Sequence, residues 1–329
     1  MHATLTVLCI VIITSSIIGL SKNTPFAAAV ITSATKITRI IPDFSFGAAA
    51  DWACNYNTVN TVNNIIAKDP KFVVGIGDYY YSDYYNESLG GGATAAAAQC
   101  WFKILKPIEQ KLRIAIGNHE HDSQSLLNFY MNRFNLTKQY YSFNYQNVHF
   151  LAISTEIPSI GIASEQYNFV NTDLAKAASN PNINWIIVYY HQTAYSTTSK
   201  VPSFTKFRNT YHPLFDKYHV DLVLQGHEHT YQRSFPIKYS VNNSSNPIVT
   251  DTNTNIYKYT NLHGVIFVVV GTAGARLFPL YGHAPYIATQ YIGHGFLDVI
   301  ITNNGRTLNA KFYANDGSIK DHFAINKSS

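Results

Sequence analysis

The chain has 329 residues, of which 46% are hydrophobic and only 13% are charged. This length suits one large catalytic domain or two small ones with a sizeable core. The net charge of +5 is mild and no run dense in Lys or Arg is present, which excludes an evident nucleic-acid-binding surface.

The first 29 residues are predicted to be a signal peptide or an N-terminal anchor, followed by a linker over residues 30–39. Residues 5–20 are nearly all apolar or small, and Ala27–Ala29 resembles a small-residue cleavage site. No Lys or Arg precedes Lys22, and the apolar run is short for a membrane span. We therefore expect a secreted or extracellular protein, which contacts a membrane only if the N-terminal segment stays uncleaved.

Between residues 40 and 225, short apolar runs alternate with segments of helical periodicity. The glycines of residues 82–94 indicate a loop. The strands are expected over residues 40–50, 72–76, 112–116, 141–145, 148–153, 185–190 and 221–225. The helices are expected over residues 58–68, 95–105, 123–134, 164–178 and 204–218.

The last third of the chain is mostly β. Residues 240–256 are rich in Asn, Ser and Thr and are predicted to form a loop. Further strands are expected over residues 265–270, 296–302, 307–313 and 322–325. This order favours an α/β (α+β) fold, a four-layer αββα sandwich of two mixed β-sheets flanked by helices. A doubly wound single sheet is the alternative, and the strand-rich tail argues against it.

Two cysteines remain in the predicted exported part, Cys54 and Cys100, because Cys9 lies in the signal segment. An oxidising compartment favours a disulfide between them. Two free thiols are the alternative.

Residues that can ligate metal ions follow the strands in order. They are Asp51, Gly77-Asp78-x-x-Tyr81, Gly117-Asn118-His119-Glu120, His191 and Gly226-His227-x-His229. The ends of strands in an α/β sheet are where such sites form, and two metals need a bridging carboxylate plus ligands of their own. Asp78 suits the bridge, because it lies where a strand becomes a loop. The pattern therefore predicts a dinuclear metal site at strand ends.

The series resembles the calcineurin-like metallophosphoesterase superfamily, and more narrowly the purple acid phosphatases. Most superfamily members carry a His two residues after the first Asp, whereas purple acid phosphatases use a Tyr three residues after the bridging Asp. This chain has Ala53 and Tyr81 at those positions. The resemblance runs from about residue 40 to 325 and implies one such domain over residues 40–329.

The resemblance also implies the metals and the reaction. Fe(III) would be held by Asp51, Asp78, Tyr81 and His229, and a divalent Fe, Zn or Mn by Asp78, Asn118, His191 and His227. The implied activity is that of a secreted acid phosphatase, a hydrolase that cleaves monoesters of a small phosphorylated substrate by attack of a metal-bound hydroxide. Besides Asp78, the implied catalytic residues are Asn118, which positions phosphoryl oxygens, and His119, which contacts phosphate and protonates the leaving group. Glu120 and Glu228 are interpreted as structural or ligand-orienting.

Two other functions stay open at this stage. One is a phosphodiesterase or nucleotide hydrolase with the same metals, and the other is a non-catalytic cell-surface binding protein on this scaffold. Plant members of the family carry further substrate-contacting His residues just beyond the His191 equivalent, whereas this chain continues Gln192-Thr193-Ala194-Tyr195. We therefore expect different acid chemistry on the substrate side, with specificity set by loops near residues 82–94, 192–203 and 272–295.

Overall fold

The structure is a computed structural model that describes residues 40–81, 95–197, 201–253 and 258–328. The predicted signal segment, the linker, the 82–94 loop and part of the 192–203 loop lie outside the described residues. All described residues belong to one unit, Ile40–Ser329. Among them, no helix combines the length and the apolar character that crossing a membrane requires.

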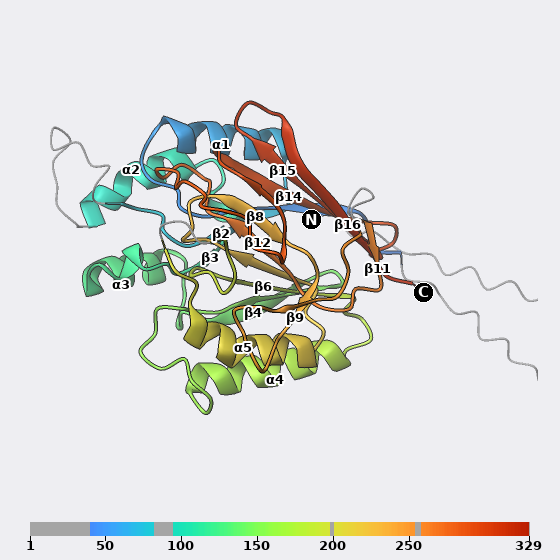
Figure 1. Ribbon diagram of the computed structural model, residues 1–329. Helices are drawn as coiled ribbons and strands as arrows, with labels where there is room; N and C mark the ends of the chain where they lie inside the picture. Colours follow the sequence, from blue (N-terminus) through green and yellow to red (C-terminus); the bar gives the residue numbers. More distant parts are fainter. Residues whose placement is uncertain (1–39, 82–94, 198–200, 254–257, 329) are drawn as a thin grey trace, which may run out of the picture. The chain divides into compact units, whose positions relative to one another are not determined.

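Two seven-stranded mixed sheets form the two central layers (Figure 1). The first sheet has the order β11 (Lys258–Thr260), β16 (Ile319–Asn326), β15 (Thr307–Ala314), β14 (Gly295–Thr302), β1 (Phe44–Ala49), β2 (Phe72–Ile76), β3 (Leu112–Ala115). The second has the order β13 (Ile287–Tyr291), β8 (Tyr231–Ser234), β12 (Ile266–Val270), β7 (Leu222–Gln225), β6 (Trp185–Tyr190), β5 (Val148–Ala152), β4 (Tyr141–Tyr145). A small ribbon pairs β9 (Ile237–Lys238) with β10 (Ile248–Val249).

Helices cover the outer faces of both sheets. On the first sheet lie α1 (Tyr56–Lys68), α2 (Ala95–Leu105) and α3 (Gln124–Arg133), and on the second α4 (Glu165–Ser179) and α5 (Thr205–Lys217). Two short 3-10 helices are η3 (Glu109–Lys111) and η4 (His119–His121). The helices α1, α3 and α4 begin where a side chain caps a free N–H group: Ser164, for example, accepts from the N–H of Tyr167 at the start of α4. This arrangement confirms the predicted αββα sandwich and excludes the single doubly wound sheet.

Aromatic side chains fill the space between the two sheets. Phe46 and Phe72, on neighbouring strands of the first sheet, stack with ring centroids 5.6 Å apart. Both meet Phe150 of the second sheet edge-on, at 5.1 Å. Each of the three is buried, so their apolar area holds the sheets face to face.

A buried ion pair also joins the sheets. Arg233 on β8 donates to both carboxylate oxygens of Asp321 on β16, at 2.6 and 3.0 Å, and Tyr231 donates to the same carboxylate at 2.7 Å. Arg233 and Asp321 are 0% and 6% exposed. The carboxylate and guanidinium therefore balance each other inside the core.

The structure corrects several predicted strands. The first strand begins at Phe44 rather than at residue 40, because Pro42 has no N–H to donate to a ladder. The strands β8, β9, β10, β11 and β13 were not predicted. Of these, β8 consists of Tyr231-Gln232-Arg233-Ser234 and is buried throughout, although it has no apolar run. It is a strand because it pairs with β12 and β13 in the sheet, and its own sequence has no hydrophobic periodicity that predicts a strand.

Cys54 and Cys100 form a disulfide with Cα atoms 6.0 Å apart. Cys54 lies just before α1, and Cys100 is on α2. The bond closes a loop between residues 46 positions apart and ties α2 to the segment that follows β1.

Asp298 is a buried acid in the middle of β14, and we expect its replacement by Asn to stabilise the protein at neutral pH. Asp298 is 4% exposed, and burial raises its pKa to about 6 even though Lys68 and Lys311 oppose the rise. Because this pKa lies above the unfolded value, the carboxyl destabilises the fold as pH rises from about 4 through 6. We expect Asp298→Asn to raise the free energy of unfolding at pH 8 by about 1–3 kcal/mol.

Urea unfolding of both proteins at pH 8 and at pH 4 measures this effect. At pH 4 the difference between the variant and wild type should become small, because the folded carboxyl is then almost fully protonated and the unfolded one is about half protonated. The exposed Asp43 provides the control, and Asp43→Asn should change stability little at either pH. An Asp298→Asn protein less stable than wild type at pH 8 contradicts the prediction.

Candidate metal centre

All seven predicted ligands lie just beyond the carboxyl ends of five strands. Asp51 follows β1, Asp78 and Tyr81 follow β2, Asn118 follows β3, His191 follows β6, and His227 and His229 follow β7. The strands β1, β2 and β3 run parallel in one sheet, and β6 and β7 run parallel in the other. Hydrogen bonds join the two sets of ends, such as His227 N–H to Asp51 Oδ2 at 2.8 Å and Ala50 N–H to Val270 O at 3.0 Å.

The first group of predicted ligands meets around the hydroxyl of Tyr81. This oxygen lies 2.7 Å from Asp51 Oδ1, 2.9 Å from His229 Nε2 and 3.3 Å from Asp78 Oδ2. Burial and, next, the carboxylate of Asp51 raise the pKa of Tyr81 well above its ordinary value. The phenol therefore keeps its proton unless a cation takes the proton's place.

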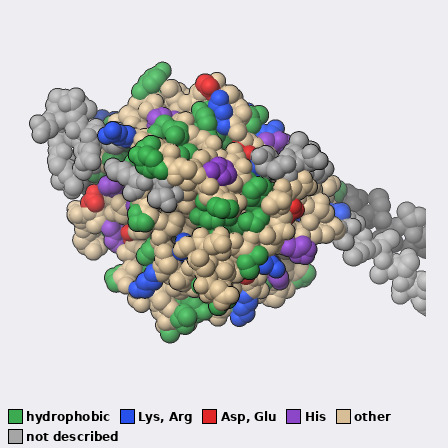
Figure 2. Space-filling model, in the orientation of Figure 1, with side chains coloured by type: hydrophobic (Ala, Val, Ile, Leu, Met, Phe, Trp, Pro, Cys, Tyr) green, Lys and Arg blue, Asp and Glu red, His purple; other side chains and the backbone are tan. Residues whose placement is uncertain are grey.

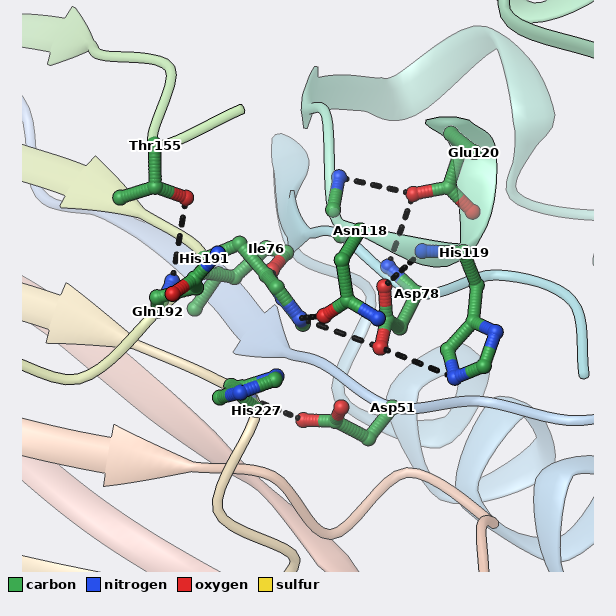
Figure 3. Close-up of polar contacts among 12 residues, drawn as sticks. Asp51, Ile76, Asp78, Asn118, His119, Glu120, Thr155, His191, Gln192 and His227 are labelled. Atoms are coloured by element: carbon green, nitrogen blue, oxygen red, sulfur yellow. Dashed lines mark hydrogen bonds and ion pairs between the residues drawn. The ribbon is translucent and has the colours of Figure 1, made fainter. Parts of the chain in front are cut away.

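The second group meets around His191. Its Nε2 lies 3.1 Å from Asn118 Oδ1 and 3.1 Å from Asp78 Oδ2 (Figure 3). The ring of His227 is centred 5.0 Å from that of His191. Ligand atoms of Asp78, His191 and His227 all lie within 4.8 Å of one another. Asp78 thus belongs to both groups, as a bridging carboxylate must.

Two ligand histidines, His191 and His229, hydrogen-bond to backbone carbonyls through Nδ1, the ring nitrogen that points away from the cavity. His191 donates from Nδ1 to Ile76 O at 2.8 Å, and His229 donates from Nδ1 to Arg276 O at 2.7 Å. A carbonyl can only accept, so these bonds place a proton on Nδ1 and leave Nε2 facing the cavity, where a bound cation would take the place of any proton on it. Metal-ligating histidines are oriented in this way. With two carboxylates, an amide oxygen and a phenol, the donor set fits two metal cations.

The backbone of the ligand loops is left-handed at three ligands. Asp51, Asp78 and His227 have φ values of 61°, 51° and 67°. Non-glycine residues in this region cost about 1–3 kcal/mol each and cluster at functional sites. Gly117 allows the loops after β2 and β3 to touch, since a Cβ there would lie 2.2 Å from Asp78 Oδ1.

Burial and the carboxylates shift the pKa values within the centre. Burial opposes the charged form of His191, but Asp78 outweighs it and raises the pKa of His191 to about 10. Burial also opposes the charge of Asp78, yet His191 and His119 hold the pKa of Asp78 below its usual range. In contrast, burial and then the neighbouring His191 lower the pKa of His227 to about 4. The cavity therefore attracts positive charge strongly around Asp78.

His119 lies at the rim of the centre, with its side chain 28% exposed. Its Nδ1 is 3.3 Å from Asp122 Oδ2 and its Nε2 is 3.9 Å from Asp78 Oδ2. Its ring centroid is 4.4 Å from that of Tyr81. His119 can therefore reach both the ligand cavity and solvent. The nearby His121 contacts Gln139 instead, at 3.0 Å.

Sequence reasoning missed several groups that support the ligands. The carbonyls of Ile76 and Arg276 leave no signal, because every residue has a carbonyl. Phe278 stacks on His229 with centroids 4.0 Å apart, and only the fold brings these residues together. Sequence reasoning interpreted Glu120 as structural or ligand-orienting but did not show its partners, which are the backbone N–H groups of Asp78, Tyr79 and Gly117 and not a ligating imidazole.

Comparison with known proteins places this centre in a family. The family model described as calcineurin-like phosphoesterase matches residues 44–231, more than half of the chain. The chain belongs to this family of phosphoesterases. The matched segment contains all seven predicted ligands.

The resemblance to purple acid phosphatases is confirmed by curated relatives and by a solved structure. Purple acid phosphatase 15 of Arabidopsis thaliana is 24% identical over 258 residues, 69% of this chain and 44% of that protein. The probable inactive purple acid phosphatase 1 of the same plant is 27% identical over 317 residues, 85% of this chain and 48% of that protein. The purple acid phosphatase PPD1 of yellow lupin (Lupinus luteus) seeds matches with a TM-score of 0.72 and 22% identity, over 87% of this chain and 54% of that one. The calcineurin-like chain thus spans about half the length of these relatives.

Proposed function

We propose that this phosphoesterase is a secreted dinuclear-metal phosphatase of the purple acid type that hydrolyses phosphate monoesters. The observation that carries the proposal is the position of the Tyr81 hydroxyl, within 3.3 Å of Asp51, Asp78 and His229 at once. A tyrosine in this place is what separates the purple acid phosphatases from other members of the superfamily. Ala53, where other members carry a histidine, agrees with it.

The donor types support the proposed metals. A phenol and two carboxylates are hard, anionic ligands, which favours Fe(III) beside Asp51, Asp78, Tyr81 and His229. An amide oxygen and two imidazoles favour a divalent Fe, Zn or Mn beside Asp78, Asn118, His191 and His227. When bound, the metals supply Lewis acidity and an acidified water.

The chain's own residues orient the substrate and supply a proton. Asn118 presents its amide to the cavity beside His191, where it can position a phosphoryl oxygen. His119 reaches both cavity and solvent and is our candidate for the acid that protonates the leaving group. Asp122, 3.3 Å from Nδ1, orients this ring so that Nε2 faces the cavity.

Export is part of the proposal and rests on two observations. The apolar residues 5–20 have the composition of a signal segment, and Cys54 and Cys100 form a disulfide, a bond typical of oxidising compartments. The proposed partner is a small phosphorylated substrate. On the face that Figure 2 shows, the Lys and Arg side chains of the described residues are scattered rather than gathered, which supports a small substrate over a nucleic acid.

The visible spectrum, the metal content and the rates on two substrates test the proposal together. We expect bound iron, a broad purple band, and faster phosphate release from an aryl phosphomonoester than cleavage of a bis-aryl phosphodiester. Tyr81→Phe should abolish the band, because the phenolate that binds Fe(III) is lost. The matched control is Tyr80→Phe, which removes a neighbouring buried hydroxyl and should keep the colour.

Each contrary outcome points to a different function. A marked preference for the diester would replace the monoesterase with a phosphodiesterase on the same centre. Less than one metal per chain and no hydrolysis would instead leave a binding protein on this scaffold. A colourless protein that is active with other metals would retain the hydrolase and remove Tyr81 from the ligand set.

A further inference from the structure

Glu120 is a fully buried acid beside the centre that belongs to neither ligand group. Its Oε2 accepts from the N–H of Asp78 at 2.9 Å and of Gly117 at 2.8 Å, and its Oε1 accepts from the N–H of Tyr79 at 2.8 Å. One carboxylate thus binds three backbone N–H groups from the loops after β2 and β3, as Figure 3 shows in part.

These N–H groups need a partner, because the β2 ladder ends at Ile76. Asp78 is left-handed, with a φ of 51°, and this turn directs its side chain into the cavity. A buried N–H without a partner costs about 1–3 kcal/mol. By accepting from Asp78 and Tyr79, Glu120 stabilises a backbone conformation that a non-glycine residue otherwise avoids.

The same short segment also holds the side chain of Asp78. The N–H of His119 donates to Asp78 Oδ1 at 3.0 Å. The other oxygen, Oδ2, is thereby left facing His191 Nε2 at 3.1 Å and the Tyr81 hydroxyl at 3.3 Å. Consecutive residues of η4 therefore fix both the backbone and the carboxylate plane of Asp78.

We infer that Glu120 is a positioning residue for the bridging carboxylate. It acts through hydrogen bonds to the backbone of the Asp78 loop, not by ligating a metal. This inference rests on the proposed two-metal function. Without Glu120, Asp78 no longer holds both oxygens in the orientation that two cations require, so metal affinity falls.

The test is a titration of metal-free protein with Zn²⁺ alone. Calorimetry well below the unfolding temperature measures the binding. We expect Glu120→Gln to weaken Zn²⁺ binding by about 10–100-fold, the usual effect of losing a supporting partner. An amide offers one acceptor oxygen in place of two, and its NH₂ group faces a backbone donor. Glu165→Gln, on an exposed glutamate, is the chemical control and should bind as wild type does.

A second control separates positioning from general loss of stability. Leu174 lies on α4 in the hydrophobic cluster between the helices and the second sheet. Leu174→Ala creates a cavity there and costs about 2–5 kcal/mol of stability. It should nevertheless bind Zn²⁺ with wild-type affinity while folded. If Glu120→Gln does not fold, Glu120→Asp takes its place, because it keeps the charge but withdraws both oxygens by one methylene.

Wild-type affinity in the folded Glu120 variant would overturn the inference. So would amides of Asp78 and Tyr79 that exchange with solvent at unprotected rates in the wild-type protein, which is measurable without any variant. A wild-type protein that binds no Zn²⁺ would contradict the proposed two-metal function itself. Failure of the Glu120 inference and failure of the proposed function therefore give different results.

Discussion

Asp78→Asn is expected to abolish phosphatase activity and to release metal from the protein. The substitution removes the one charge shared by the two ligand groups, and its NH₂ group cannot serve as a ligand. Loss of a partner that only supports a ligand costs 10–100-fold, so loss of the bridge itself should lower the rate by more than about 100-fold. The measurements are phosphate release and metal content per chain.

Asp69→Asn is the matched control, because it makes the same chemical change at another left-handed aspartate. Asp78 and Asp69 have φ values of 51° and 47°, and asparagine tolerates this conformation well. Asp69 lies at the C-terminal cap of α1, away from the centre. The control should keep both metal and rate. An Asp78→Asn protein with two metals and the wild-type rate would exclude Asp78 as the bridge.

Asp321→Asn is expected to give the largest loss of stability. It leaves the guanidinium of Arg233, which is fully buried between the sheets, without its bidentate partner. Breaking a buried ion pair on one side costs about 3–5 kcal/mol. The free energy of unfolding in urea at pH 7 measures the loss.

Two further variants test this explanation. Glu165→Gln breaks an exposed pair with Lys138 and should cost less than about 1 kcal/mol. Replacing both core partners, as Arg233→Met with Asp321→Leu, should recover much of the loss because no charge is left buried. A loss below about 1 kcal/mol in Asp321→Asn would mean that another group neutralises Arg233.

Local pattern was enough to predict the strands that have an apolar or alternating run. The strands β2, β4 and β6 have the bounds expected from their apolar or alternating runs. The helices begin and end within about two residues of the expected positions, because their apolar spacing and capping residues are local signals. The strands that were missed, such as β8, are polar in sequence and become strands only through their neighbours in the sheet.

The order and spacing of the ligand residues were likewise visible in the chain. A carboxylate, an amide or an imidazole at a strand end has a recognisable neighbourhood, and parallel strands bring such ends to one edge. For this reason the seven ligand candidates, the two-sheet fold and the family resemblance followed from sequence by itself.

Only the tertiary structure decided what holds these groups in place. Three sets of contacts join segments far apart in the chain. Glu120 accepts from the N–H groups of Asp78 and Tyr79, backbone carbonyls accept from His191 and His229, and Arg233 pairs with Asp321. Such contacts depend on how the two sheets and their loops pack, and a carbonyl or N–H has no identity in the sequence. The sequence by itself therefore determined which residues can act as ligands, and the packing of the sheets and loops determined how those side chains are oriented.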